Sequence, residues 1–158
     1  MSSDKSSKRP FRVGIAGLGV VGGEVARQLS HRGADIAAVA GHPFAITAVS
    51  ARSRNADRGF DMSGIAWVEN AAEIASRDDV DIVVEMIGGE EGVALDLVRG
   101  ALSSGKHVVT ANKALLAHHG TELAGLAESN NVGLMFEAAV AGGIPAVKAL
   151  REGLAANS

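Results

Sequence analysis

Short apolar runs alternate along this chain with longer segments in which apolar residues recur every three or four positions. The short runs predict β-strands and the longer segments predict helices. The predicted strands cover residues 11–16, 46–51, 65–68, 80–87, 107–110 and 133–137, and the predicted helices cover residues 20–31, 70–76, 90–103, 113–129 and 144–154. This alternation predicts an α/β protein with a doubly wound, mostly parallel sheet and helices on both faces.

The first predicted strand runs directly into three closely spaced glycines, after which a helical pattern begins. Gly17, Gly19 and Gly22 have the spacing G-x-G-x-x-G. In a strand–turn–helix unit the first glycine allows a tight turn, the second lets the backbone approach a diphosphate, and the third lets the helix pack closely on the strand. Amide groups at the start of the helix would bind the anion. The pattern favours a Rossmann-like nucleotide-binding domain; the alternative is a glycine-rich turn that binds nothing.

Composition narrows the possible classes of protein. The chain has 158 residues, of which 47% are hydrophobic and 21% charged, and this mix is typical of one soluble globular domain. A net charge of −3 and only 3% aromatic residues disfavour nucleic-acid binding. The absence of cysteine excludes disulfides, thiolate metal sites and cysteine nucleophiles. We find no apolar run long enough for a membrane span or a secretion signal, and we expect a cytoplasmic protein with a disordered leader over residues 1–10.

The residues after the second predicted strand bear on the choice of nucleotide. An NAD-selective site usually has an acidic residue there, which binds the ribose hydroxyls. This chain has Arg52 and Arg54 instead, with no acid before Asp57. A guanidinium group suits the extra phosphate of NADP, so we expect NADP, with NAD possible. The alternative is that both arginines are ordinary solvated charges.

The predicted strand over residues 80–87 ends in two glycines. Ligands of open α/β sheets bind at the carboxyl ends of the strands, so we expect Ile87, Gly88 and Gly89 to border the cofactor. Glu85 interrupts the apolar run of the same strand. It either faces the crevice or is a structural carboxylate with hydrogen-bond partners.

Two later segments also follow strands at this edge. Lys113 comes just after the fifth predicted strand and opens a helix, where a lysine could hold a substrate oxygen or carboxylate, or carry a proton. The alternative is a solvated lysine in the first turn of the helix. Residues 137–145 follow the last strand and contain Gly142, Gly143 and Pro145, so this turn could aim carbonyl groups at a cation or ligand.

Two patterns only imitate functional motifs. Residues 100–107 look like a phosphate-binding loop, but His107 replaces the required Ser or Thr, and the segment runs from a helix into a strand, which is the reverse of the required order. The histidines lack the spacing of a metal site, so we expect all of them to be structural or solvated; they are His31, His42, His107, His118 and His119.

Residues 13–22, 110–113 and 137–148 together resemble the amino-terminal region of homoserine dehydrogenases. The resemblance spans nearly the whole chain after residue 10. Enzymes of this family interconvert homoserine and aspartate 4-semialdehyde with NAD or NADP, on the branch that leads to threonine and methionine. For this chain, the resemblance implies an oxidoreductase with a small-molecule substrate.

The resemblance also implies roles for individual residues. Leu18, Val20 and Val21 would contact the nucleotide together with the glycines, and Arg52 would reach the ribose phosphate. Lys113 would lie beside the nicotinamide and the substrate. A monovalent cation such as Na⁺ would be held by carbonyl groups at four positions, which are Glu137, Val140, Gly142 and Ile144.

The family pattern continues beyond residue 158 into a substrate-binding and dimerising region, which this sequence does not contain. We therefore expect residues 11–143 to form an NAD(P)-binding domain, residues 144–158 to begin a helix that connects to the missing region, and the parent protein to be a homo-oligomer. The chain alone would be an incomplete catalyst. Two alternatives stay open: another Rossmann-type dehydrogenase of amino-acid metabolism, or a non-catalytic NAD(P)-sensing module.

Overall fold

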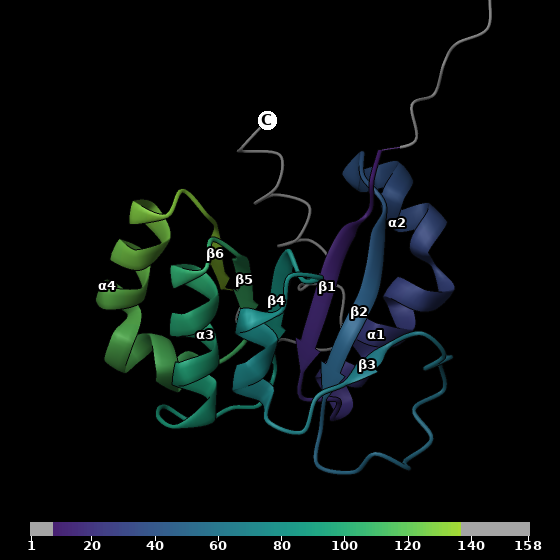
Figure 1. Cartoon of the computed structure of the whole chain (residues 1–158), viewed down its shortest axis with the longest axis horizontal. Helices are drawn as coiled ribbons and strands as arrows, with labels where there is room; N and C mark the ends of the chain where they lie inside the picture. Colours follow the sequence, from purple (N-terminus) through teal and green to yellow (C-terminus); the bar gives the residue numbers. More distant parts are fainter. Residues whose placement is uncertain (1–7, 137–158) are drawn as a thin grey trace, which may run out of the picture.

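A computed structural model describes residues 8–136, in which six parallel strands form one sheet (Figure 1). The strand order is β3-β2-β1-β4-β5-β6. Their bounds are β1 Phe11–Ala16, β2 Phe44–Ser50, β3 Ala66–Trp67, β4 Ile82–Glu85, β5 His107–Thr110 and β6 Leu134–Phe136. The order changes direction between β1 and β4, and doubly wound nucleotide-binding folds form their ligand crevice at this kind of switch point. The predicted fold class is confirmed.

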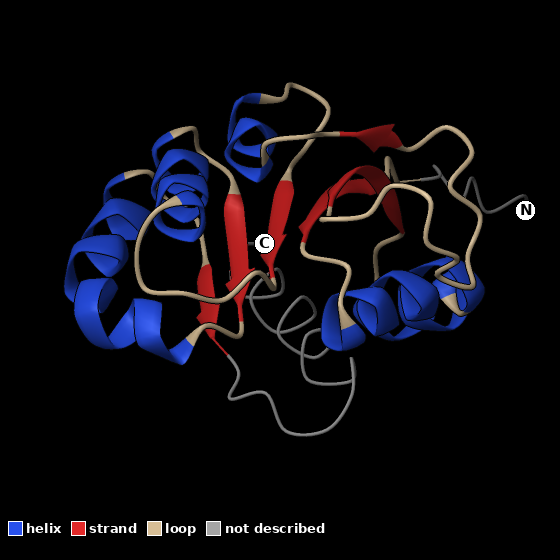
Figure 2. Ribbon diagram, turned by 90° about the horizontal axis from the view of Figure 1, so that it is seen from below, coloured by secondary structure: helices blue, strands red, loops and turns tan. Residues whose placement is uncertain are grey.

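Helices cover both faces of the sheet (Figure 2). The helices α1 and α2 lie on one face, and the 3₁₀ helix η1, α3 and α4 lie on the other. Their bounds are α1 Val20–His31, α2 Gly33–Ala40, η1 Ala71–Ser76, α3 Val93–Ser103 and α4 Lys113–Ser129. Successive side chains of a strand point to opposite faces, so Ile82 and Val84 pack into the core under α1 while Val83 packs into the core under α3 and α4. None of the helices in the described part of the chain has the length and apolar character to cross a membrane.

The predicted elements at 11–16, 20–31, 107–110 and 113–129 have the bounds that the sequence predicts, and the other predicted elements within the described residues are present with shifted ends. The strand over 80–87 is limited to Ile82–Glu85, and the segment at 70–76 is a 3₁₀ helix whose first turn is capped by the Asn70 side chain. The helix α2 was not predicted, because glycines bracket it and its apolar residues show no clear face; it contains no fully buried residue. The predicted helix at 144–154 and leader residues 1–7 lie outside the described residues.

One glycine inside β1 has a packing role. A Cβ atom at Gly14 would lie 2.5 Å from the Cγ2 atom of Ile74, which is fully buried in η1. The register between β1 and β2 also shifts between Val13 and Gly14. The 3₁₀ helix therefore packs directly on the bare backbone of β1, and this close contact helps to fix one face of the sheet.

An ion-pair cluster joins two strands at the amino edge of the sheet, where the strands begin. The carboxylate of Asp81, just before β4, accepts hydrogen bonds from the Arg12 guanidinium at 2.7 and 3.0 Å, from the Arg12 backbone at 2.9 Å, and from Arg9. Partial burial by itself raises the pKa of Asp81, but these hydrogen bonds outweigh that effect and hold its pKa well below the ordinary value of 3.8. The cluster therefore ties β1 to β4 most strongly when Asp81 is ionised.

We expect Gly14→Ala to lower the free energy of unfolding by about 1–3 kcal/mol, because the new methyl group overlaps Ile74 in a packed core. Urea denaturation measures the change. The matched control is Gly33→Ala, where a Cβ would meet no atom within 4 Å and stability should change little. Equal stabilities for the two variants would contradict this account of the contact.

We expect Asp81→Asn to destabilise the protein by about 1–3 kcal/mol near pH 6.5, because it removes charge-assisted hydrogen bonds. The native pKa is depressed, so the wild-type advantage is present above the unfolded pKa of about 3.8 and is lost as the pH falls below it. Urea unfolding at pH 6.5 and pH 3 should show the gap narrowing at pH 3. Asp35→Asn, which alters an exposed pair, is the control.

Candidate functional site

The candidate residues come just after the last residues of four neighbouring strands, and these last residues are in register across the sheet. Ala16 is in register with Ser50 on β2 and with Glu85 on β4, and Glu85 is in register with Thr110 on β5. Each of these strands ends at this row, so the segments that follow lie side by side at the carboxyl edge. The structure thus brings together the glycine turn, the arginine loop, the turn after β4 and the start of α4.

The glycine turn between β1 and α1 leaves no space for side chains at two of its three glycines. Gly17 has φ +93°, and a Cβ there would lie 2.6 Å from the carbonyl oxygen of Met86. A Cβ at Gly22 would overlap the carbonyl oxygen of Gly17. A Cβ at Gly19 would meet no atom within 4 Å, so the backbone there is open. This geometry fits the tight turn, the close helix packing and the exposed approach expected of the motif.

The start of α1 has the features that anion-binding helix termini share. Gly19 is the N-cap residue, no side chain caps the helix, and the first turn carries no acidic residue. The amide groups of a first helical turn have no partner within the helix and lie at its positive end. The side chain of Val20 is 90% exposed here, whereas Leu18 is buried in the core and could contact a nucleotide only through its backbone. Val21 is half-buried.

The loop after β2 has two exposed arginines and begins beside the glycine turn. The carbonyl oxygen of Ser50 accepts a hydrogen bond from the Gly17 amide at 2.8 Å, which fixes the start of the loop. Arg52 and Arg54 follow it, and both are exposed. The nearest acid, Asp57, accepts a hydrogen bond from the amide of Gly59. The loop therefore offers cations rather than a carboxylate to a ribose.

A third arginine, which the sequence analysis did not identify, organises this loop. Arg58 donates hydrogen bonds to the carbonyl oxygens of Ser53 and Ala56, and its guanidinium lies 5.5 Å from the centroid of the Trp67 ring. These contacts involve the backbone of its own loop and a side chain of β3. No sequence pattern distinguishes such an arginine from its solvated neighbours.

Glu85 at the end of β4 is a fully buried carboxylate with three partners. One oxygen accepts hydrogen bonds from the amides of Ile87 at 2.7 Å and Gly88 at 3.0 Å, and the other accepts one from the Thr110 hydroxyl at 2.6 Å. Of the two sequence-based alternatives, the structure shows the hydrogen-bonded carboxylate. Its contacts fix the exposed turn of Ile87, Gly88 and Gly89, in which both glycines have positive φ.

The same hydrogen bonds continue to the start of α4. The Thr110 hydroxyl oxygen accepts a bond from the Asn112 amide at 3.0 Å, and the Asn112 side chain caps α4 by accepting from the Leu115 amide at 3.1 Å. The side-chain amide of Asn112 also donates to the carbonyl of Gly89 at 2.5 Å. The turn after β4 and the start of α4 are therefore one connected unit.

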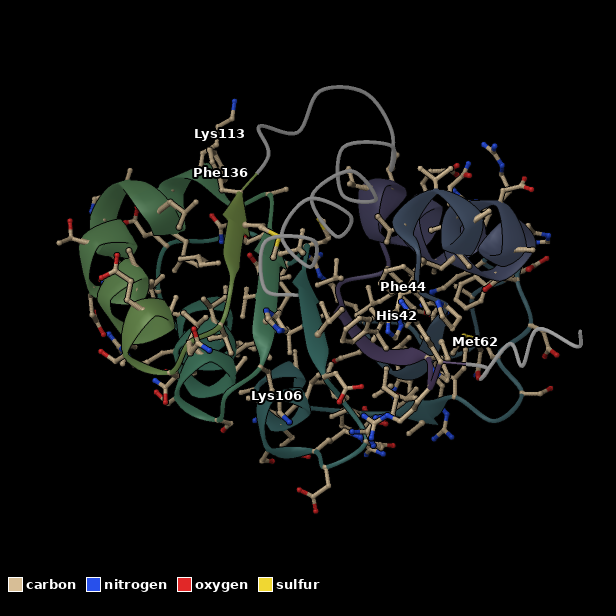
Figure 3. All side chains as sticks on the ribbon, turned by 90° about the horizontal axis from the view of Figure 1, so that it is seen from above. His42, Phe44, Met62, Lys106, Lys113 and Phe136 are labelled. Carbon is tan, nitrogen blue, oxygen red and sulfur yellow. The ribbon has the colours of Figure 1, made fainter. Side chains whose placement is uncertain are left out.

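Lys113 is the first residue of α4 and is exposed. Figure 3 shows it extending outward at the end of the sheet where Phe136 lies and away from Lys106 at the opposite end. Its side chain makes no hydrogen bond to another residue of the range 8–136. A cation at a helix N-terminus opposes the helix dipole, so this position does not favour lysine for stability. The arrangement leaves the ammonium group available to a ligand.

The segment at 100–107, whose sequence resembles a phosphate-binding loop, has a structural role. Residues 100–106 run from the end of α3 into β5. The ammonium group of the largely buried Lys106 donates hydrogen bonds to the carbonyl oxygens of Arg77 at 2.8 Å and Val80 at 2.9 Å. It holds the amino edge of the sheet together and is directed away from the candidate site.

Metal binding by side chains has no support in the described part of the chain, where no group of three or more His, Asp or Glu residues is arranged to hold an ion. Instead, the histidines contact other residues of the protein. His31 contacts the Gly59 carbonyl, His107 accepts a bond from the Gly133 amide while burial lowers its pKa, and His118 pairs with Glu90. The proposed cation ligands lie outside the described residues; they are Glu137, Val140, Gly142 and Ile144.

A tight glycine turn at the switch point, a helix start without a side-chain cap and a neighbouring loop with exposed arginines are typical of a dinucleotide-binding domain of the dehydrogenase type. Residues 17–137 match the family model described as "Homoserine dehydrogenase, NAD binding domain". The chain belongs to the homoserine dehydrogenase family, and this match supports a nicotinamide coenzyme.

Known relatives agree with this assignment. The homoserine dehydrogenase of Neisseria gonorrhoeae is 48% identical over 149 residues, which cover 94% of this chain and 34% of the relative. That of Pseudomonas aeruginosa is 44% identical over 149 residues, again 94% of this chain and 34% of the relative. The crystal structure of a homoserine dehydrogenase from Thiobacillus denitrificans is 42% identical with a TM-score of 0.75, covering 94% of this chain and 34% of that one. The chain thus spans about a third of the length of these relatives.

We expect Gly19→Ala to weaken the binding of NADPH and NADH alike by about tenfold or more, because the methyl group occupies the space through which a diphosphate approaches the backbone. Isothermal titration calorimetry measures both affinities. The fold should be unaffected, since the new Cβ meets no protein atom and φ at Gly19 is −72°. Unchanged affinity for both coenzymes would show that the diphosphate binds elsewhere.

Proposed function

We propose that this chain binds NADP at the carboxyl edge of its sheet and forms the coenzyme domain of an enzyme that interconverts homoserine and aspartate 4-semialdehyde. The single observation that carries the proposal is the open backbone at Gly19, in a turn that lies between the loop of Arg52 after β2 and the turn after β4. The names of the relatives support the proposed reaction, and the geometry of the carboxyl edge supports the proposed position of the coenzyme.

The preference for NADP over NAD rests on charge. The 2′-phosphate of NADP is the group by which the two coenzymes differ at the ribose. Arg52 directly follows the strand beside the glycine turn and is exposed, and Arg54 is close behind it. The nearest carboxylate, Asp57, is engaged with a backbone amide of its own loop. A guanidinium group binds a phosphate through two parallel hydrogen bonds, so this loop favours NADP, and NAD would bind more weakly.

Lys113 is proposed to contact the substrate. The bound coenzyme supplies a hydride acceptor at its nicotinamide ring. Lys113 stands at the edge of the sheet on the β5 side and has an ammonium group without a described partner. There it would bind an oxygen of homoserine or of the semialdehyde and fix the substrate's orientation. Lys113 is the residue for which we propose a catalytic role.

The other parts of the proposal concern the longer relatives as well as this chain. We propose a monovalent cation such as Na⁺ at the carbonyl groups of Glu137, Val140, Gly142 and Ile144. The substrate-binding region, a homo-oligomeric parent protein and a cytoplasmic location are likewise proposed by analogy with enzymes of about three times this length. The chain by itself is proposed to bind coenzyme without efficient turnover.

We expect Arg52→Ala to weaken the affinity for NADPH by roughly tenfold to a hundredfold, because a charge-assisted pair of hydrogen bonds to phosphate is lost. The affinity for NADH should change less than threefold or so, since NADH has no 2′-phosphate. Calorimetric titration of the same protein sample with each coenzyme makes the comparison.

Arg32→Ala is the matched control, because Arg32 is also exposed but lies at the far end of α1. It should leave both affinities unchanged. Equal losses for NADPH and NADH in Arg52→Ala would refute the phosphate role of Arg52 while leaving dinucleotide binding intact. The absence of binding of either coenzyme to the folded wild-type chain would refute the proposed function as a whole.

A further inference from the structure

Glu85 is the only fully buried acidic side chain in the described part of the chain, and it lies on a central strand of the sheet beside the switch point. All three of its contacts are hydrogen-bond donors: two backbone amides and one hydroxyl. The Thr110 hydroxyl donates to one oxygen of Glu85 and accepts a bond from the Asn112 amide, and the two backbone amides can only donate. The contacts therefore satisfy the ionised carboxylate.

No cation within residues 8–136 pairs with this carboxylate. The neighbouring strand β1 contributes the apolar Ala16, β5 contributes a neutral threonine, and the turn contributes backbone amides. A buried charge without an opposite charge is costly, and neutral polar groups can also hold a turn. The negative charge thus needs an explanation beyond the fixing of the turn.

The direction in which a dinucleotide crosses the site follows from the strand order. The arginine loop after β2 would hold the adenosine ribose on one side of β1, and the glycine turn after β1 would hold the diphosphate. The nicotinamide half must then lie on the other side of β1, over the ends of β4 and β5, where Glu85 and its turn are. The oxidised ring carries a positive charge, whereas the reduced ring is neutral.

We infer that Glu85 is a specificity-determining residue of the coenzyme site, whose buried negative charge favours the oxidised coenzyme over the reduced one. This inference rests on the proposed function, since it requires a nicotinamide coenzyme in the crevice. Glu85 does not touch the reacting atoms. It acts through the field of its charge and through the turn of Ile87 and Gly88 that it holds in place.

The test compares Glu85→Gln with the wild-type chain by titrating the same sample with NADP⁺ and with NADPH. Glutamine keeps nearly the same shape and can still accept both amide bonds, but it lacks the charge. We expect the ratio of the two dissociation constants, NADP⁺ over NADPH, to rise by at least about threefold. This ratio is independent of the fraction of folded protein, because a loss of folded molecules weakens both affinities by the same factor.

Two further variants separate charge from geometry. Thr110→Val keeps the charge of Glu85 but removes one hydrogen bond, and Glu85→Asp keeps the charge on a shorter side chain. Both variants should weaken the binding of NADP⁺ and of NADPH by the same factor and leave the ratio of the two dissociation constants unchanged. If circular dichroism shows that Glu85→Gln does not fold, Glu85→Ala takes its place in the same assay with the same expected rise.

The outcomes are distinguishable from those of the proposed function. If the wild-type chain binds both coenzymes and the ratio is unchanged in Glu85→Gln or in Glu85→Ala, the inference is overturned and the proposed function stands. An equal rise in Glu85→Asp and Glu85→Gln also overturns it, because geometry would then explain the effect. A folded wild-type chain that binds neither coenzyme overturns the proposed function and this inference together.

Discussion

At two glycines of the turn from β1 into α1, backbone packs directly against backbone, and the rest of the candidate site depends on this constraint. The carbonyl of Met86 excludes a side chain at Gly17, and the carbonyl of Gly17 excludes one at Gly22. The strand, the helix and the turn after β4 can therefore approach one another until backbone meets backbone. The start of α1 is thereby placed at the switch point of the sheet, with open space in front of Gly19.

The charges around this turn are unequal on its two sides. Exposed guanidinium groups follow β2, and a buried carboxylate ends β4. An oxidised NADP molecule has the complementary arrangement, with a phosphate on its adenosine ribose and a positive ring at its other end. The hydrogen bonds from Glu85 through Thr110 to Asn112 connect this carboxylate to the helix that carries Lys113, so one network orders both the turn after β4 and the start of α4.

The contacts that stabilise the fold and the proposed coenzyme site lie at opposite edges of the same sheet. At the amino edge, Asp81 with Arg12 and Lys106 with two carbonyl groups join neighbouring segments through partners within the protein. At the carboxyl edge, the side chains of Arg52 and Lys113 are exposed and make no hydrogen bond to another residue of the range 8–136. The side chains that join the strands therefore lie away from the edge at which we propose that the coenzyme binds.

Local patterns in the sequence determined the fold class, the glycine turn, the bounds of α1 and α4, and the candidates Arg52 and Lys113, because each depends on periodicity or on short-range spacing. Only the tertiary structure decided the role of Glu85, since its partners come from β5 and from a turn whose conformation the sequence does not specify. The same holds for Arg58 on Trp67 and for Gly14 under Ile74. The helix α2 was missed because apolar residues also lie on its exposed side, so its half-buried face, which includes Ile36 and Ala37, produces no clear period in the sequence. Contacts between residues far apart in the chain leave no regular spacing, and they become visible only once the strands are in register.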